Sequence, residues 1–393
     1  MATHTTRSYP VTALVLRGLL AVALVVPVGL LFGRTWGEEG DRIATADQER
    51  LGIEYLKTLG PLTIALTDAQ SAAVAGREFK RETLTQAVAA TAAVDARIGG
   101  SLHTHERWTS LREKIEGLLG GDTPDATTVY NNYGEAAELL LALYDQVRDR
   151  SHLIREQDAD AYYLQDGASE ELPEAIVAAG RFADLAVLTG KVRTDLPTAT
   201  ANLLTARDGV LSPVSDLAQD LQSAIEGTSS RTMSGNLLGR LDRFQRGVQS
   251  LTQSLSALDG RTPVDSSRVN PARVELQAAG VELAATILDE LDGLIAQRGD
   301  DLSGSRLMAL LLLLAGILLA LVPLAALLVS GLRRPAARPA PAPRQAGPTA
   351  PSGPPGPPPA PTHGRPRDDD PYAALAALDG GARNAEREWS RAR

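Results

Sequence analysis

The chain has 393 residues, enough for two or three soluble domains of ordinary size. It contains no cysteine, which excludes disulfide scaffolds, zinc sites built on thiolates and thiol catalysis. Aromatic residues are only 4% of the chain, a composition that disfavours β-sandwich cores and favours helices. The formal net charge is -9.

Two apolar segments, residues 11–33 and 307–332, set the predicted architecture. The second has 26 residues without a charge, more than the ~20 that a helix needs to cross a bilayer. The first contains Arg17, which can reach the near interface, and is bracketed by Tyr9 and Trp36 as interfacial anchors. Both segments are predicted to be transmembrane helices. A cleaved signal peptide is the alternative for the first, although no small-x-small cleavage site follows Phe32.

The distribution of charge predicts the orientation. Arg333 and Arg334 directly follow the second segment, and residues 1–33 carry two Arg and no acid. Residues 34–306 hold 27 bases and 42 acids, a net charge of -15. The chain has 35 Arg against four Lys and is rich in Ala, a composition that suggests a bacterial gene of high GC content. Because positive charge stays on the cytoplasmic side, we expect a two-span protein of a bacterial cell membrane with both termini in the cytoplasm. Residues 34–306 are then extracytoplasmic.

Residues 34–306 show helical spacing of apolar residues almost throughout. The clearest run alternates steps of four and three, as in left-handed bundles, and comprises Leu237, Leu241, Phe244, Val248, Leu251, Leu255 and Leu258. A second run repeats every seven residues through Val274, Val281, Leu288 and Ile295, after Asn270 as N-cap. Helices are expected near 36–76, 82–98, 103–119, 125–157, 159–190, 197–227, 232–259 and from 270 into the membrane.

The predicted fold class is therefore all-α, an elongated up-down helical bundle flanked by two transmembrane helices. Two stacked four-helix bundles that share the long first and last helices are a variant of this prediction. The expected order is a cytoplasmic N-terminus (1–10), a transmembrane helix (11–33), the outer helical domain (34–306), a transmembrane helix (307–332), a Pro-rich disordered linker (333–371) and a short C-terminal helix (372–393).

Two stretches carry a resemblance to a known family. They are Glu49-Arg50-Leu51-Gly52-Ile53-Glu54-Tyr55-Leu56 running on to Gly76-Arg77, and Asp158-Ala159-Asp160-Ala161-Tyr162-Tyr163-Leu164-Gln165-Asp166 followed by Leu172-Pro173-Glu174. This region resembles the extracytoplasmic sensor domains of bacterial chemoreceptors and sensor kinases, of the helical bimodular and four-helix-bundle types. The resemblance implies a homodimer and, as in several members, binding of a small organic acid. The chain departs from the family after the second span, because only 61 residues remain and the cytoplasmic output domains are missing.

No motif for catalysis or for a cofactor is present, and we predict neither an enzyme nor a bound cofactor or metal. His103 and His105 form the one histidine pair, but positions two apart point to different helix faces. The basic residues Arg77, Lys80 and Arg81 are candidates to bind a carboxylate; the alternative is a solvated turn. Tyr162 and Tyr163 are candidates for a polar pocket among acids, or for a helix start with one tyrosine packed inward.

The tail offers candidate partner contacts. Pro348 and Pro351 have P-x-x-P spacing, which fits aromatic-lined grooves, or else belong to a flexible spacer. Tyr372 begins a short predicted helix, and Trp389 lies near the C-terminus. These residues could recruit a cytoplasmic signalling protein.

We therefore expect a sensor-like membrane protein that contacts the lipid bilayer, binds a small ligand or an envelope partner, and signals through a separate cytoplasmic protein. No nucleic-acid partner is expected. The alternative is a non-sensory membrane scaffold with a Pro-rich cytoplasmic tether.

Overall fold

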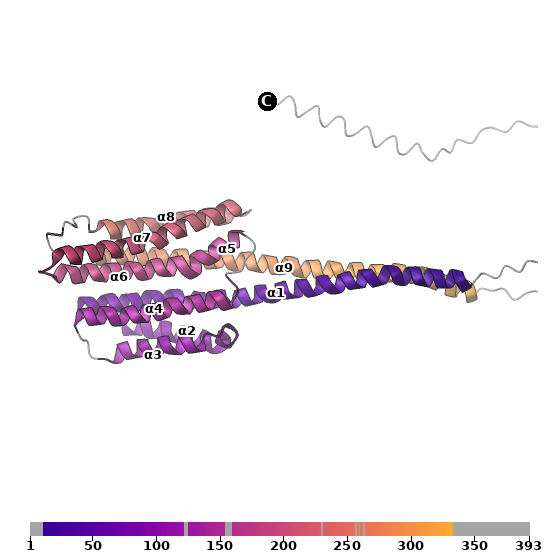
Figure 1. Cartoon of the computed structure of the whole chain (residues 1–393), viewed down its shortest axis with the longest axis horizontal. Helices are drawn as coiled ribbons and strands as arrows, with labels where there is room; N and C mark the ends of the chain where they lie inside the picture. The colour runs from indigo at the N-terminus through magenta and orange to yellow at the C-terminus, as the bar shows by residue number, and fades with distance from the viewer. Residues whose placement is uncertain are drawn as a thin grey trace, which may run out of the picture. The chain divides into compact units, whose positions relative to one another are not determined.

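The structure of the protein is a computed structural model that describes residues 11–121, 125–153, 159–228, 231–255, 258, 260–261 and 264–332. These residues are helices and connecting turns, without a β-strand among them, as the sequence predicts. The unit Arg334–Arg393 lies outside the described residues, so its predicted linker and helix stay predictions. The elements, labelled in Figure 1, are α1 (Val11–Ala75), α2 (Arg81–Leu102), α3 (His105–Gly120), α4 (Ala126–Arg150), α5 (Ala159–Asp166), the π-helix η1 (Gly167–Glu171), α6 (Leu172–Lys191), α7 (Leu196–Gly227), α8 (Arg231–Gln253) and α9 (Val269–Leu332).

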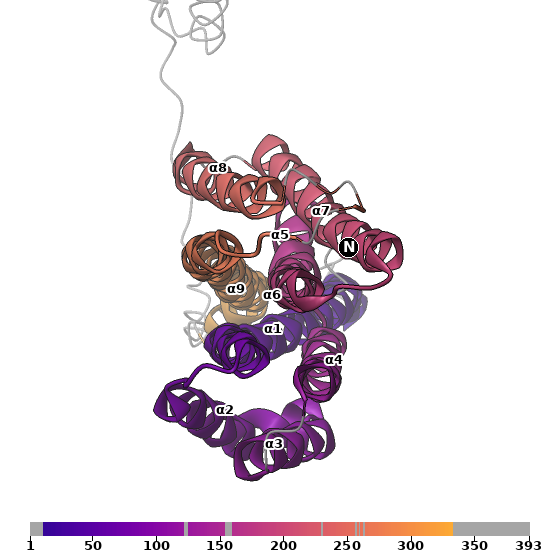
Figure 2. The same ribbon diagram turned by 90° about the vertical axis from the view of Figure 1, so that its left-hand side faces the viewer.

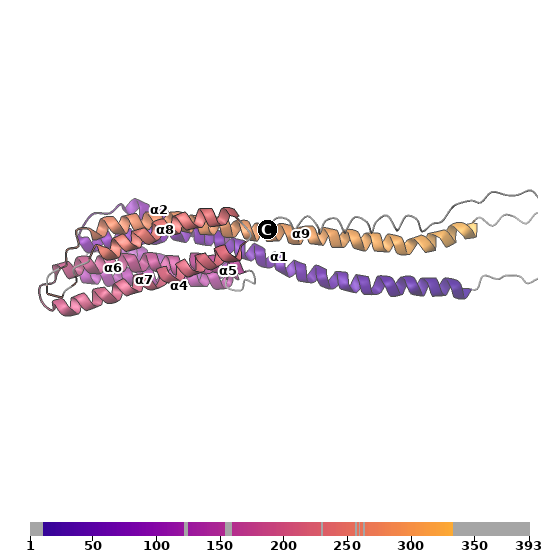
Figure 3. The same ribbon diagram turned by 90° about the horizontal axis from the view of Figure 1, so that it is seen from above.

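The helices form two groups that lie side by side (Figure 2). Helix α1 packs against α2 and α4 in one group, and α9 packs against α8 and α6 in the other. The groups meet where α1 contacts α9 and α6 and where α4 contacts α6 and η1. They occupy the same stretch of the long axis (Figures 1 and 3), so the stacked arrangement expected as a variant does not occur. Each group instead contains one of the two long helices.

The buried side chains follow the helical spacing of the sequence. The four-three run is buried from Leu237 on α8 to Leu255 just after it, and on α1 Tyr55, Leu59 and Leu62 have no exposed surface. The seven-residue run of α9 is only half buried: Leu288 and Ile295 lie in the core, whereas Val274 and Val281 are 49% and 42% exposed. The buried face of α9 near its start passes instead through Leu276, Leu283 and Ile287, and the first two lie on the opposite side of the helix from Val274 and Val281.

Several details of the predicted helices were wrong. Helix α4 ends at Arg150 instead of continuing to 157, and a turn with His152 at a φ of 65° follows. The helix predicted over 159–190 contains the π-helical turn η1. Helix α8 ends at Gln253 instead of 259. Helix α9 begins at Val269, and the Asn270 side chain bonds to arginines instead of serving as the predicted N-cap.

Helices α1 and α9 extend together beyond the other helices (Figure 1). Along this extension the Arg306 guanidinium lies 4.6 Å from the centre of the Trp36 ring and donates to the Trp36 carbonyl oxygen at 2.8 Å. Nearby, Ser305 bonds to Glu39 at 2.8 Å. Trp36 and Arg306, the residues expected at the outer ends of the two predicted spans, are therefore at the same level.

Helix α9 holds the one segment of the described residues that is long and apolar enough to cross a membrane. An 18-residue window there has a mean hydropathy of 2.5, and none of it is buried. Residues 11–33 are helical as part of α1. The side chain of Arg17 and those of most residues between 11 and 24 lie outside the described part of the structure. Tyr9, Arg333 and Arg334 lie outside it entirely. The first membrane span therefore stays a prediction.

Candidate functional site

The predicted basic residues line a groove at the end of the helical domain where α1 ends. Arg77, Lys80 and Arg81 lie in the α1–α2 turn and at the start of α2. Lys191, at the end of α6, joins them around a groove of about 940 Å³. The rest of the lining includes the apolar surface of Phe79, Val129 and Tyr133 and the acids Glu78 and Glu82. The chain reverses direction at Gly76, whose φ of 69° suits glycine.

Three of the four cations of this basic groove bond to neutral acceptors. Arg77 donates to Asn270 Oδ1 at 3.1 Å, and Arg81 donates to the Leu119 carbonyl at 3.1 Å. Lys191 Nζ lies 3.5 Å from the Val74 carbonyl oxygen. Within the described part of the chain, none of the four is in an ion pair with a carboxylate. A cation cluster with open donors can accept an anionic ligand.

A buried polar network joins α1 and α9 next to the groove. Arg273 of α9 is 3% exposed and pairs with Asp68 of α1 at 2.6 Å. Gln277, one turn on, donates to Thr67 at 2.7 Å. Asn270 accepts from both Arg273 and Arg77, and so connects this network to the groove.

Asp184 of α6 belongs to the same buried region. Its exposed fraction is 2%, and burial raises the pKa of its carboxyl to about 7. This rise in pKa is partly offset by hydrogen bonds with Ser71 and Gln70 and by the positive charges of Arg273 and Arg77. A carboxyl that titrates near neutral pH therefore lies beside the two long helices.

The two tyrosines lie on α5, toward the other end of the helical domain (Figures 1 and 3). Tyr162 is 38% exposed, Tyr163 packs partly against the core, and their rings meet edge to face at 5.4 Å. The structure therefore does not unite Arg77, Lys80 and Arg81 with Tyr162 and Tyr163 in one site. Asp158, which the sequence places before the tyrosines, lies outside the described residues.

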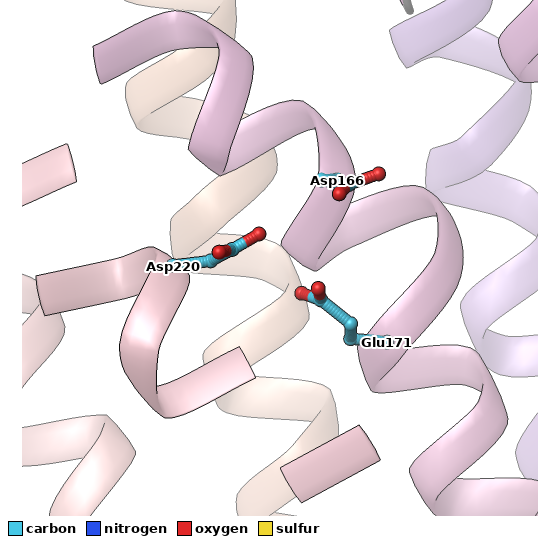
Figure 4. A group of neighbouring side chains, drawn as sticks. All are labelled: Asp166, Glu171 and Asp220. Atoms are coloured by element: carbon cyan, nitrogen blue, oxygen red, sulfur yellow. The ribbon is translucent and has the colours of Figure 1, made fainter. Parts of the chain in front are cut away.

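Beside the tyrosines, three carboxyl groups from separate elements converge: Asp166 of α5, Glu171 of η1 and Asp220 of α7 (Figure 4). One oxygen of each lies within 4.8 Å of the others. Burial, and next to it the charges of Asp220 and Asp166, raise the pKa of Glu171 to about 9. The pKa of Asp220 is raised by burial as well. We call this group the carboxylate triad.

The histidine pair has a structural place. His103 ends α2 in a left-handed conformation with a φ of 51°. His105 Nδ1 lies 2.6 Å from Asp95, a buried carboxyl that also accepts from Tyr55 at 2.9 Å. These contacts hold α1, α2 and α3 together. The predicted tail residues Pro348, Pro351, Tyr372 and Trp389 lie outside the described residues.

Lys191, Glu171 and Asp220 were not singled out from the sequence. Lysine is scarce, with four in the chain, but only the packing of α6 near the α1–α2 turn brings Lys191 to the groove. Glu171 and Asp220 lie in ordinary amphipathic stretches, and only the packing of α7 against α5 and η1 brings them together.

Comparisons with family models, with curated proteins and with solved structures find no match to this chain.

Proposed function

We propose that the protein is a membrane-anchored, sensor-like receptor that binds a small organic anion in the basic groove outside the membrane. The observation that carries the proposal is the set of four cations around one groove without a carboxylate partner among the described residues. These four cations lie in a region with a net charge of -15, in which acidic side chains outnumber basic ones and could have paired with them. A carboxylate ligand would supply the missing charge-assisted bonds.

The position of the groove supports a route from ligand to membrane. Arg77 joins the end of α1 to the start of α9 through Asn270, so an anion that competes for Arg77 alters this link. Helix α9 continues without a break from Val269 to Leu332 and includes the apolar segment. A ligand can move α1 and α9 relative to each other only if it binds more tightly to one arrangement of the two helices than to another. Recruitment of a cytoplasmic partner by the Pro-rich tail is part of the same proposal.

The membrane anchorage rests on separate support. The exposed apolar window of α9 has the length and composition of a span. The contact of Arg306 with Trp36 brings the boundaries of the two apolar segments together, as one membrane surface would require. Arginines follow the second segment, which favours a cytoplasmic C-terminus.

Calorimetric titration of the full chain in nanodiscs tests the proposal, with acetate, succinate, malate, citrate and benzoate as probes. We expect at least one of these anions to bind. Lys80→Gln combined with Lys191→Gln should weaken that binding by about tenfold to a hundredfold, because two charged contacts are lost.

The matched control is Lys114→Gln, which removes a lysine of α3 that pairs with Glu135 outside the groove. This variant should bind like the native protein. Absence of binding to every anion, or an equal loss in the control, would contradict the receptor proposal and favour the scaffold alternative.

A further inference from the structure

The carboxylate triad has no place in the proposed anion receptor and is far from the groove in sequence and in the fold. Its three acids come from different elements, so that the triad exists only when α5, η1 and α7 are packed (Figure 4). The Glu171 carboxylate points toward the space between Asp166 and Asp220 in the same view. An arrangement of this kind costs free energy unless a proton or a cation reduces the repulsion.

The local backbone explains how the acids come so close. Gly167 begins the π-helical turn, and a Cβ there would lie 3.0 Å from Leu217 Cδ1 and 3.7 Å from Glu171 Oε2. The glycine therefore allows α7 to approach η1. π-Helical turns are rare and are frequent at functional sites.

The charges of the triad are only partly compensated. Arg148 of α4 contacts Asp166 at 3.2 Å and also pairs with Glu170. In the described residues no Lys, Arg or His forms an ion pair with Glu171 or Asp220. Glu171 is 9% exposed, and its Oε2 atom is buried without a hydrogen-bond partner. Without a cation, a protonated Glu171 can donate to Asp220. Once that proton is lost, the buried Oε2 atom is an oxygen that a cation can take as a ligand.

We propose that Asp166, Glu171 and Asp220 bind a hard divalent cation, Ca²⁺ in the first place. Ca²⁺ takes carboxylate and water oxygens at about 2.3–2.6 Å in flexible geometry, and three oxygens within 4.8 Å of one another can share one such ion. The sequence predicts no metal site, because the three acids are not arranged in a motif. Bound Ca²⁺ would fasten the α5–η1 segment to α7 and so stabilise the group of helices that contains α6, α8 and α9.

The experiment measures thermal unfolding of the full chain in nanodiscs after treatment with EDTA, with added CaCl₂, MgCl₂ or NaCl of equal ionic strength. At a hundredfold excess over Kd, Ca²⁺ should raise the Tm by about 5 °C. NaCl at equal ionic strength should not. Glu171→Gln and Asp220→Asn should each abolish the Ca²⁺-dependent shift, while their Tm without cation stays at or above the native value, because a buried repulsion has been removed.

Asp216→Asn is the matched control. Asp216 lies one turn before Asp220 on α7, is exposed, and is not a member of the triad. Its charge acts on Glu171 and Asp220, but its oxygens are not among those that converge. This variant should keep most of the Ca²⁺ response. A second readout is Tb³⁺ luminescence excited through tyrosine, since the charges of Asp166 and Asp220 act on the Tyr162 hydroxyl. Emission should appear in the native protein and be lost in Glu171→Gln.

A Tm shift no larger than that given by NaCl would overturn the proposal. A proton shared within the triad would then be what reduces the repulsion among its carboxylates. An unchanged Ca²⁺ response in Glu171→Gln and Asp220→Asn would overturn it too. Neither result bears on the basic groove, so the anion-receptor proposal is tested independently.

Discussion

At Asp184, burial and the positive charge of its neighbours act on the carboxyl in opposite directions. It lies on α6 among Ser71, Gln70, Arg77 and Arg273, which face it from α1 and its C-terminal turn and from α9. Two guanidiniums favour the carboxylate, but the loss of solvent outweighs them and raises the pKa to about 7. Titration of this side chain therefore acts on the contacts of α6 with the two long helices.

The pKa shift predicts the pH dependence of stability. In the unfolded chain an Asp has a pKa of about 3.9, so from about pH 4 to pH 7 the folded state binds more protons. The free energy of unfolding should then fall as the pH rises through this window, by up to about 4 kcal/mol at about 1.4 kcal/mol per pKa unit. Asp184→Asn should flatten this slope, as measured by thermal unfolding between pH 4.5 and 8.

The control for this prediction is Asp68→Asn. Asp68 contacts the same Arg273 but is half exposed. This variant should lose stability while it keeps the pH slope of the native protein. A native-like slope in Asp184→Asn would show that another group is responsible.

At the scale of the helix, two glycines of α8 have opposite roles. Gly247 is buried where α8 meets α9, and a Cβ there would lie 2.9 Å from Leu276 Cα. Gly239, on the same helix, is exposed, and a Cβ at that position would have no neighbouring atom within 4 Å. Close packing requires the first glycine, while the second only lowers helix propensity.

Gly247→Ala should therefore destabilise the protein by about 1–3 kcal/mol, because the backbone of α9 would have to move. Gly239→Ala should stabilise it by about 0.5–1 kcal/mol. Urea unfolding of both variants beside the native protein measures the difference. Equal effects of the two substitutions would mean that α8 and α9 do not approach as described.

The elements also show where prediction from the sequence works. The stripe of α8 was predictable because burial on one face needs only the spacing of apolar residues. The carboxylate triad was not, because it depends on a π-helical turn and on the position of α7. Arg77, Lys80 and Arg81 were predictable as a cluster, but Lys191 joins them only through tertiary packing.

For the whole molecule, the central feature is the pair of long helices. Helix α1 contacts α9 over the helical domain, and the two continue together to the contact of Trp36 with Arg306. The other helices pack along one part of this pair (Figure 3). A change at the start of α9 therefore has a continuous helical path to the apolar segment, and its consequence for function depends on which side of a membrane each end occupies.

Topology can be tested directly because the chain has no cysteine, so one introduced thiol gives the whole signal. Ser303→Cys places it on an exposed position of α9 just before the apolar segment, and Ser352→Cys places it beyond that segment. In intact cells a membrane-impermeant maleimide should label the thiol at position 303 and spare the one at 352, which should react only after permeabilisation. The charge-based orientation predicts this result because the arginines after the second segment stay inside. Labelling of both positions in intact cells, or of the position at 352 alone, would contradict the proposed two-span arrangement and with it an outer location for the basic groove.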